Sequence, residues 1–251
     1  MEDLISLLPI WVGKFFWPFC RILSAISIAP ITGDVAVPVR FRIAISFGLT
    51  LVAMPMLDTI HVNAFSLQAI ALMFEQIFIG LIFGLAFFSI MSVFNMLGYY
   101  ISSQMGLSMA VMNEPGTHNS STVIASIFYV LNALLFFAYD VHLLIANLVF
   151  SSFQSWPINS GKSLFSISMV INQVGWSFSA ALLLATPVVF GTLVVQVGMG
   201  MLTRATPTIN IFSLGFSVTV LLGLFLLGLQ VPSLSGHYQQ MTQQILNMFL
   251  S

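Results

Sequence analysis

Long apolar runs dominate the chain, and short polar stretches that contain Gly or Pro separate them. Six such runs lie at residues 4–31, 43–57, 69–101, 123–150, 167–202 and 211–232. About 20 apolar residues are enough for a helix to cross a bilayer, and most of the runs reach that length. The pattern therefore predicts an all-α, polytopic helical membrane protein that is built from hydrophobic helical hairpins.

Two of the runs fit a simple membrane helix poorly. The first contains Lys14 and Arg21, which are seven residues apart and so share one helix face. These two cations either snorkel to an interface or form a polar stripe that faces a partner. The run at 43–57 has 15 residues and contains Pro55. It is therefore either a tilted, mismatched span or a helix buried in protein.

Gly and Pro mark two further features inside the runs. Gly80 and Gly84 form a GxxxG pattern, which permits close contact with another helix. Pro187 lies in the middle of the fifth run, where it is expected to kink a helix or divide a hairpin.

The chain ends in an amphipathic tail at about residues 236–251. Apolar side chains recur there at helical spacing, namely Tyr238, Met241, Ile245, Met248 and Phe249. The other face is mostly Gln rather than Lys or Arg. This composition disfavours an anionic lipid surface and favours a partner protein or a wet lumen.

The stretch 99–122, between the third and fourth runs, differs from both of its neighbours. It contains Gly, Pro and small polar residues, which stop a helix. Its first half is nonetheless apolar and flexible, with Met105, Leu107, Met109, Ala110, Val111 and Met112. Because Met side chains adapt to irregular surfaces, this loop could seal an opening and yield when something passes. The alternative is a re-entrant or buried loop that simply packs.

Composition narrows the class of protein. The chain is 59% hydrophobic and 5% charged, whereas soluble domains carry about 25% charged residues. The net charge of −1 argues against a nucleic-acid partner. The single Cys20 is expected to act as a small buried hydrophobe. The sequence shows no enzyme motif and no metal-ligand cluster, so we predict neither catalysis nor a cofactor.

Asp140 and His142 are ionisable residues inside the fourth run. They are either functional at membrane depth or close to water near a helix end. On one helix they would point about 200° apart and could not easily share a proton or a metal ion. The alternative function is a small proton-coupled secondary transporter that uses one of them as its proton carrier. Such a transporter needs internal repeats and midplane charge pairs, and the sequence shows no clear example of either.

Several motifs, taken in order, resemble the flagellar branch of the FliR/SctT family of type III secretion export-gate subunits. They are Phe16-Trp17-Pro18 with Arg21, Ala29-Pro30-Ile31, Gln104-Met105-Gly106-Leu107-Ser108, Glu114-Pro115-Gly116 with His118, His142, Ser152-Phe153, Trp156-Pro157, Arg204 to Phe212 with Pro207 and Asn210, and Gly215-Phe216. Two positions depart from the family pattern. Glu114 stands where Asp is usual, and Val141 stands where Gly usually precedes the histidine.

The resemblance implies a single helical export-gate domain over 1–251 that looks like a fused FliP-type and FliQ-type unit. It implies assembly with FliP-type and FliQ-type gate subunits, in contact with membrane lipid and with other membrane proteins of the flagellar export apparatus. The location would be the bacterial inner membrane at the flagellar basal body. Unfolded flagellar proteins would cross the membrane through the resulting channel, and the loop at about 102–122 would be its plug.

Overall fold

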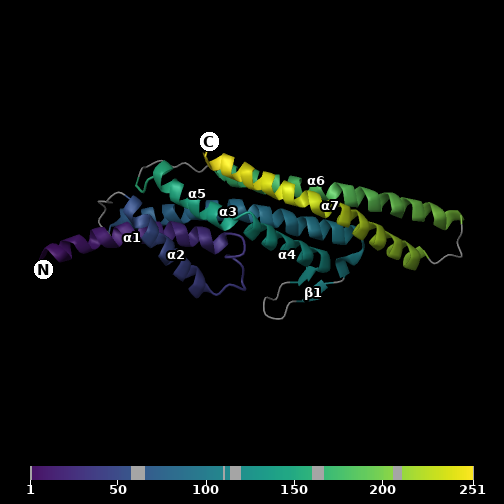
Figure 1. Cartoon of the computed structure of the whole chain (residues 1–251), viewed down its shortest axis with the longest axis horizontal. Coiled ribbons are helices and arrows are strands. Elements are labelled where there is room, and N and C mark those ends of the chain that lie inside the picture. The colour runs from purple at the N-terminus through teal and green to yellow at the C-terminus, as the bar shows by residue number, and fades with distance from the viewer. Residues whose placement is uncertain are drawn as a thin grey trace. The chain divides into compact units, whose positions relative to one another are not determined.

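The computed structural model describes residues 2–57, 66–109, 111–113, 120–159, 167–205 and 211–250. For residues 2–12, 109, 111–113, 120, 167–169, 203, 211–213 and 250 it describes only the backbone. The elements in chain order are α1 (Glu2–Ile28), α2 (Val39–Ala53), the 3-10 turn η1 (Met54–Met56), α3 (Leu67–Gln104), the 3-10 turn η2 (Leu107–Met109), β1 (Val111–Asn113), β2 (Ser120–Thr122), α4 (Val123–Ala138), α5 (Val141–Ser155), α6 (Ile167–Ala205) and α7 (Ile211–Leu250) (Figure 1).

The predicted class, an all-α polytopic membrane protein, is confirmed. Within the described residues, four stretches of helix are long and apolar enough to cross a membrane: Val39–Met56, Leu67–Gln104, Val170–Leu202 and Leu214–Phe249. The pair α4 and α5 adds a fifth if it is counted as one broken span. In the part of the chain that the structure describes, α1 is not among these candidates, which agrees with the expectation that the first run, with Lys14 and Arg21, fits a simple membrane helix poorly.

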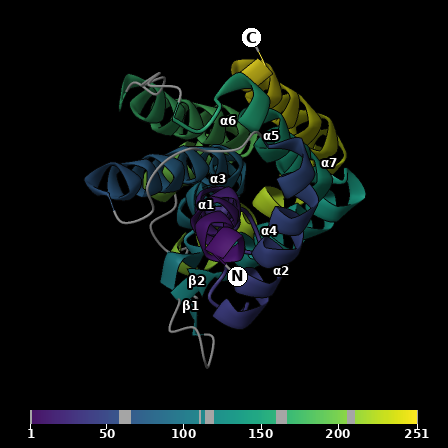
Figure 2. The ribbon, with the colours of Figure 1, turned by 90° about the vertical axis from the view of Figure 1, so that its left-hand side faces the viewer.

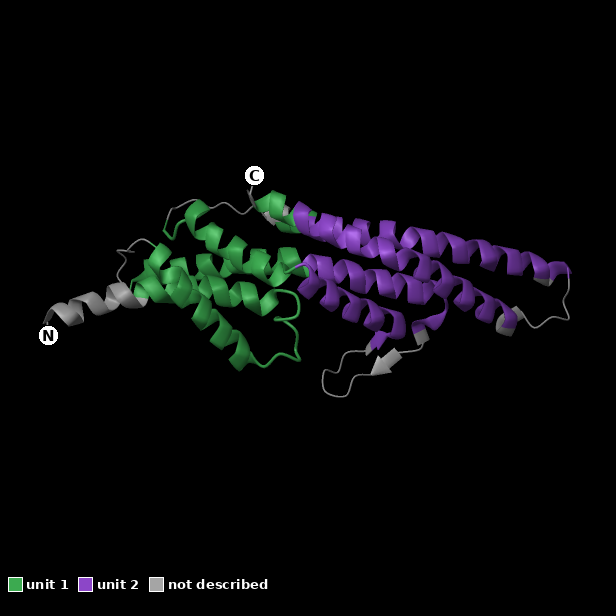
Figure 3. Ribbon diagram, in the orientation of Figure 1, with its two compact units in different colours: residues 1–88, 140–172, 245–251 green, residues 89–139, 173–244 purple. Residues whose placement is uncertain are grey.

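Contacts divide the chain into two compact units (Figure 3). Unit 1 comprises residues 1–88, 140–172 and 245–251, and unit 2 comprises residues 89–139 and 173–244. The long helices α3, α6 and α7 each contribute residues to both units. The single helical domain over 1–251 stays a prediction.

In unit 1, α1 packs against α2 and α3 (Figures 1 and 2). A Cβ added at Gly80 would collide with the backbone carbonyl of Arg21, and one added at Gly84 would lie 2.6 Å from the carbonyl oxygen of Ala25. The GxxxG pattern therefore forms a close seam between α3 and α1, as the sequence predicted. At the same interface the indole of Trp17 donates a hydrogen bond of 3.3 Å to the carbonyl of Ala69.

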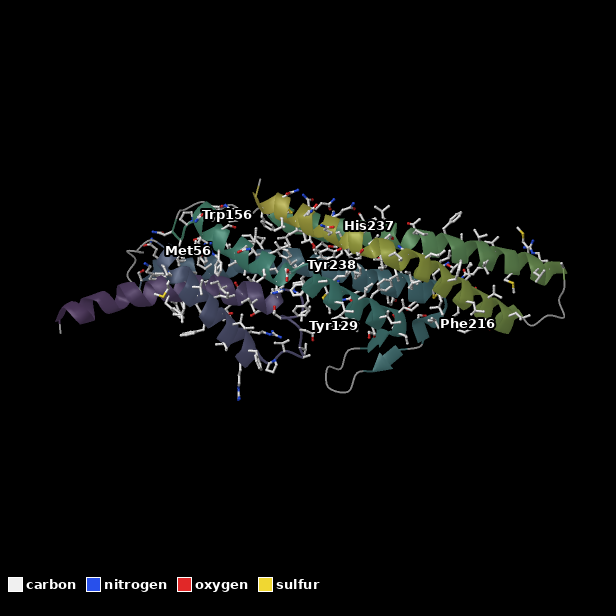
Figure 4. All side chains as sticks on the ribbon, viewed as in Figure 1. Met56, Tyr129, Trp156, Phe216, His237 and Tyr238 are labelled. Atoms are coloured by element: carbon white, nitrogen blue, oxygen red, sulfur yellow. The ribbon has the colours of Figure 1, made fainter. Side chains whose placement is uncertain are left out.

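In unit 2, α3 packs against α4, and α7 joins them through aromatic rings. The Phe94 ring lies 6.4 Å from that of Phe128 and 5.8 Å from that of Tyr238. The Tyr238 ring also stacks on Tyr139, at 6.0 Å between centroids. Figure 4 labels Tyr238 on its helix. These edge and stacked arrangements are favourable geometries for aromatic pairs.

The amphipathic character of the C-terminal tail is confirmed. Residues at helical spacing are buried, namely Leu234, Tyr238, Met241, Ile245 and Phe249. An amide face is exposed, made of Gln239, Gln240, Gln243, Gln244 and Asn247. The tail is not a separate element, however, because α7 continues through Pro232. Neighbouring groups re-satisfy the backbone around a proline in helices of this kind, so Pro232 does not end the helix.

Three further expectations need correction. The fourth run is not one helix, because α4 ends at Ala138 and α5 begins at Val141. Pro187 does not divide a hairpin, since α6 is continuous around it. The second run begins earlier than predicted, and its helix α2 buries only Ser46, Thr50 and Ala53. This chain therefore does not bury α2, and its large apolar side chains face outward.

Candidate functional site

The central segment begins where α3 ends. The backbone N–H of Met105 donates to the carbonyl of Ile101 at 3.0 Å, and that of Gly106 donates to Ser103 at 3.1 Å. Gly106 then adopts a φ of 77°, which is the left-handed conformation that glycine reaches at no steric cost. The chain turns there into η2, so Gly106 sets the direction in which the segment leaves the helix.

Met105 is packed rather than free. Its side chain is only 1% exposed. A Cβ added at Gly223, on α7, would collide with the end of the Met105 side chain. The missing side chain of Gly223 thus provides the space that Met105 fills. For this one residue the interpretation as a packed loop fits better than that of a mobile plug.

The residues that follow Met105 are less enclosed. Leu107 and Ser108 are half-buried. Only backbone is described for Met109, Val111 and Met112, and the remaining predicted segment residues, Ala110, Glu114, Pro115 and His118, lie outside the described residues. Their role as a plug stays a prediction.

The two ends of the segment meet in a short antiparallel ladder that the sequence did not predict. Val111 pairs with Thr122, and Asn113 pairs with Ser120. The side chain of Thr122 then caps α4 by accepting a hydrogen bond of 3.4 Å from the N–H of Ala125. Thr is a favoured residue at this position because its oxygen satisfies a free backbone donor. The segment is therefore a hairpin that returns directly into α4.

Three residues of α6 and α7 contact the base of the segment, and two of them, Gln196 and Gly223, were not singled out by the sequence analysis. The side chains of Gln104 and Gln196 lie 3.4 Å apart, and Gln196 Nε2 also donates to the Gln104 carbonyl at 2.8 Å. A Cβ at Gly106 would lie 3.4 Å from the ring of Phe216 (labelled in Figure 4). Gln196 lies 92 residues from Gln104, and no local pattern in the sequence marks it or Gly223.

A second group of motif residues meets around Arg21. The Arg21 side chain is 0% exposed, which corrects both predictions for it, since it neither snorkels nor faces a partner. Its Nε donates to Gln76 Oε1 at 2.8 Å, and its terminal nitrogens donate to Ser152 Oγ at 3.0 Å and to the Trp156 carbonyl at 3.1 Å. Figure 4 labels Trp156 in this region. The guanidinium also lies 4.4 Å from the centre of the Phe153 ring, a cation–π distance.

Burial lowers the pKa of the Arg21 guanidinium to about 9, and the nearby charge of Glu75 partly offsets this effect. The group therefore stays protonated at neutral pH. On the same helix, burial raises the pKa of the half-buried Cys20 thiol to about 11. This agrees with the prediction that Cys20 is a small hydrophobe, since the thiol rather than the reactive thiolate prevails at neutral pH.

The other predicted motif residues are dispersed. Pro30 is buried, whereas His142 and Arg204 are exposed. Pro207 and Asn210 lie outside the described residues. Asp140 is exposed and has a φ of 52°, so it precedes α5 instead of lying within a helix. The argument that Asp140 and His142 point about 200° apart on one helix is therefore wrong, while their expected position near a helix end is confirmed.

In the described parts of the chain, no three His, Cys, Asp or Glu side chains come close enough together to hold a metal ion. What the geometry does bring together is a hairpin segment with a fixed base, in unit 2, and a buried arginine cluster, in unit 1. Both unite motifs that are far apart in the sequence.

Residues 12–245 match the family described as "Bacterial export proteins, family 1". The chain belongs to this family. Among its relatives, the flagellar biosynthetic protein FliR of Pectobacterium carotovorum subsp. carotovorum is 31% identical over 239 residues, which cover 95% of this chain and 92% of the relative. FliR of Escherichia coli (strain K12) is 30% identical over the same coverage. FliR of Bacillus subtilis (strain 168) is 25% identical over 231 residues, covering 90% of this chain and 88% of the relative.

Proposed function

We propose that this membrane protein is a flagellar export-gate subunit. It assembles with FliP-type and FliQ-type subunits, and with other membrane proteins of the export apparatus, in the bacterial inner membrane. Unfolded flagellar proteins pass through the channel so formed. The role is one of conduction and closure rather than catalysis. Membership of an export family and the near full-length similarity to proteins named FliR support the proposal.

The observation that carries the gate role is the hairpin between α3 and α4. Two antiparallel helices can be joined by only a few residues, yet here residues 105–122 separate them. The ladder between β1 and β2 brings both ends of this segment together. We propose that the apolar residues of the segment close the channel, because Met side chains fill irregular spaces and still yield. Met105 serves instead as a fixed support.

A shortened hairpin tests the closure. Val111 and Thr122 face one another across the ladder, so replacing residues 112–121 with Asn-Gly would close the strands with a two-residue turn and pull on neither helix. The same variant carries Ser in place of Leu107, Met109 and Ala110, so that the apolar side chains proposed to close the channel are removed together with Met112. The complex should assemble normally, while small solutes or ions should leak across the membrane. A matched control replaces residues 114–119 with six Gly and Ser residues, which keeps the length and the Met side chains and should leak less. Normal assembly of the shortened variant without a leak would contradict the plug.

The proton-coupled transporter is not supported. The family is an export family, and both ionisable residues on which the alternative relied, Asp140 and His142, are exposed at the α4–α5 break. A proton carrier at membrane depth is expected to face the interior of a bundle.

A further inference from the structure

The base of the central segment is held at three points that lie far apart in the sequence. Gln104, Met105 and Gly106 are consecutive, and each meets a different residue of α6 or α7 in unit 2. Gln196 contacts the first, Gly223 the second and Phe216 the third. Three consecutive contacts of different chemistry leave the segment's first three residues little freedom.

We infer that Gln196, Gly223 and Phe216 are positioning residues that hold the base of the central segment, Gln104 to Gly106, against α6 and α7. This inference rests on the proposed gate function, because it assigns the residues that hold the base of that gate. The three contacts together are called the base contacts below.

The Met105–Gly223 contact is the steric part. Met105 is one of the most buried side chains of unit 2, and the place of a Cβ at Gly223 is occupied by the Met105 side chain. Any larger residue at position 223 must therefore displace Met105. Elsewhere on α7, Gly228 has no atom within 4 Å of the place where its Cβ would lie, so the tight fit belongs to position 223 and not to every glycine of the helix.

The Gln104–Gln196 contact fixes the end of α3 by hydrogen bonds. Gln196 binds both the side chain and the backbone carbonyl of Gln104. The carbonyls of the last residues of a helix lack partners within the helix. Gln196, on α6, supplies a hydrogen-bond donor to one such carbonyl, that of Gln104. The contact thus holds the end of α3 itself, which is the point from which the segment starts.

Gly106 completes the base contacts. Its positive φ turns the chain, and the Phe216 ring lies near the turn, at 3.4 Å from the place where a Cβ of Gly106 would be. Beyond this point Leu107 and Ser108 are only half-buried. Within the base contacts Met105 is buried, Gln104 is half-buried and Gly106 is exposed. The packed anchor is therefore Met105, and the hydrogen bonds to Gln104 hold the residue before it.

The test measures how accessible the segment is, in the complete complex with its FliP- and FliQ-type subunits in nanodiscs. Cys20 is replaced with Ser, and Ser108→Cys supplies a thiol just after the base contacts. The readout is the labelling rate by a water-soluble maleimide. Gly223→Ala should increase this rate about tenfold, because one extra methyl group in a filled contact disfavours the closed state. Gly228→Ala is the matched control and should leave the rate unchanged.

A compensating pair separates this contact from general damage to α7. Combining Gly223→Ala with Met105→Ala makes room for the new methyl group, so the labelling rate should return close to that of the parent. If the double variant labels as fast as Gly223→Ala alone, or if Gly223→Ala labels like the parent, the inference is overturned. Should Gly223→Ala fail to assemble, Gln196→Leu gives a second arm, because it removes both hydrogen bonds at an exposed position. It should also increase labelling, and an unchanged rate would again overturn the inference.

The labelling rate and the membrane leak report on different claims. If the Asn-Gly replacement of residues 112–121 causes no leak while labelling follows the pattern above, the inference on the base contacts is supported and the plug role is contradicted. If the replacement makes the membrane leak while the compensating pair fails to restore the labelling rate, the plug role is supported and the inference on the base contacts is overturned.

Discussion

Arg21 shows how a single charge is accommodated inside an apolar helical unit. It lies on α1, but its partners come from α3, from α5 and from the residue that follows α5. A buried charge is expensive unless hydrogen bonds satisfy it. Three such bonds and the Phe153 ring supply that compensation. The planar guanidinium suits this arrangement better than an ammonium would, since it presents several donors in fixed directions.

Replacing Arg21 should therefore destabilise unit 1. We expect Arg21→Ala to cost about 3 kcal/mol or more, because it leaves buried partners such as Ser152 without their donor. Arg21→Lys keeps the charge but loses the several hydrogen-bond donors of the planar guanidinium, so its stability should lie between that of Arg21→Ala and that of the parent. Thermal unfolding of the solubilised complex measures the effect. Lys14→Ala, on the same helix at a half-buried position, is the control. Equal stability of Arg21→Ala and the control would contradict a structural role for Arg21.

Gly80 tests the seam between α1 and α3. A methyl group there would collide with the Arg21 carbonyl and the Ser24 hydroxyl, so Gly80→Ala should separate the two helices and lower the unfolding midpoint by the equivalent of about 1–3 kcal/mol. Gly48→Ala is the control, because nothing lies within 4 Å of its added Cβ. It should be neutral or slightly stabilising, since Ala favours a helix by up to about 1 kcal/mol over Gly. The seam would be in doubt if both variants behaved alike.

At the scale of elements, hydrophobic patterning located the helices but not all of their ends. The break between α4 and α5 was missed because Tyr139 and Asp140 are neither Gly nor Pro, and apolar residues continue on both sides. The end of α7 was misjudged for the opposite reason, since Pro232 and Gly236 resemble a stop signal inside a continuous helix. The GxxxG pattern, by contrast, is local, and its consequence was predictable.

The sites show the same division between local and long-range information. The residues of the central segment could be predicted, because Gly106 and the Met side chains differ from the flanking runs. The partners of Arg21 and of Gln104 could not, since their hydrogen bonds join residues 55 to 135 positions apart. Only the packing of helices brings such residues together, and a single sequence contains no pattern that records it.

The backbone at Asp140 gives the α4–α5 break a testable physical basis. Its φ of 52° is left-handed, a conformation that Gly and Asn adopt readily and β-branched residues do not. Asp140→Asn and Asp140→Gly should therefore leave motility and complex abundance intact, although neither has a titratable group. Asp140→Val should reduce the amount of assembled complex, at a cost of about 1–2 kcal/mol. An assembled but inactive Asp140→Asn complex would instead revive the proton carrier.

At the scale of the whole molecule, the chain exposes a large apolar surface that lipid or other proteins must cover. Large apolar side chains face outward along α2, α6 and α7. On α6 they extend from Val174 to Met201, a distance of about 40 Å along the helix. The hydrocarbon core of a bilayer is only about 30 Å thick. Lipid around an upright helix would therefore leave part of this surface uncovered, and the proposed assembly with other gate subunits would cover the rest.

The chain should accordingly depend on its partners. Expressed alone and solubilised in detergent, it should aggregate or be degraded, because its apolar faces exceed what a bilayer or micelle covers. Expressed together with FliP-type and FliQ-type subunits, it should enter one stable particle of defined size. Size-exclusion chromatography with a membrane-fraction immunoblot measures both outcomes.

Two substitutions on α6 test which surface the partners cover. Phe190→Asp and Met201→Asp, at exposed positions on α6, should reduce entry into the particle, since a charge in a covered apolar surface is left unpaired. The matched variant Gln243→Asp lies on the exposed amide face of α7, where the charge replaces a polar group, and should have a smaller effect. A stable, monodisperse monomer, or full assembly of both α6 variants, would contradict the dependence on partner subunits.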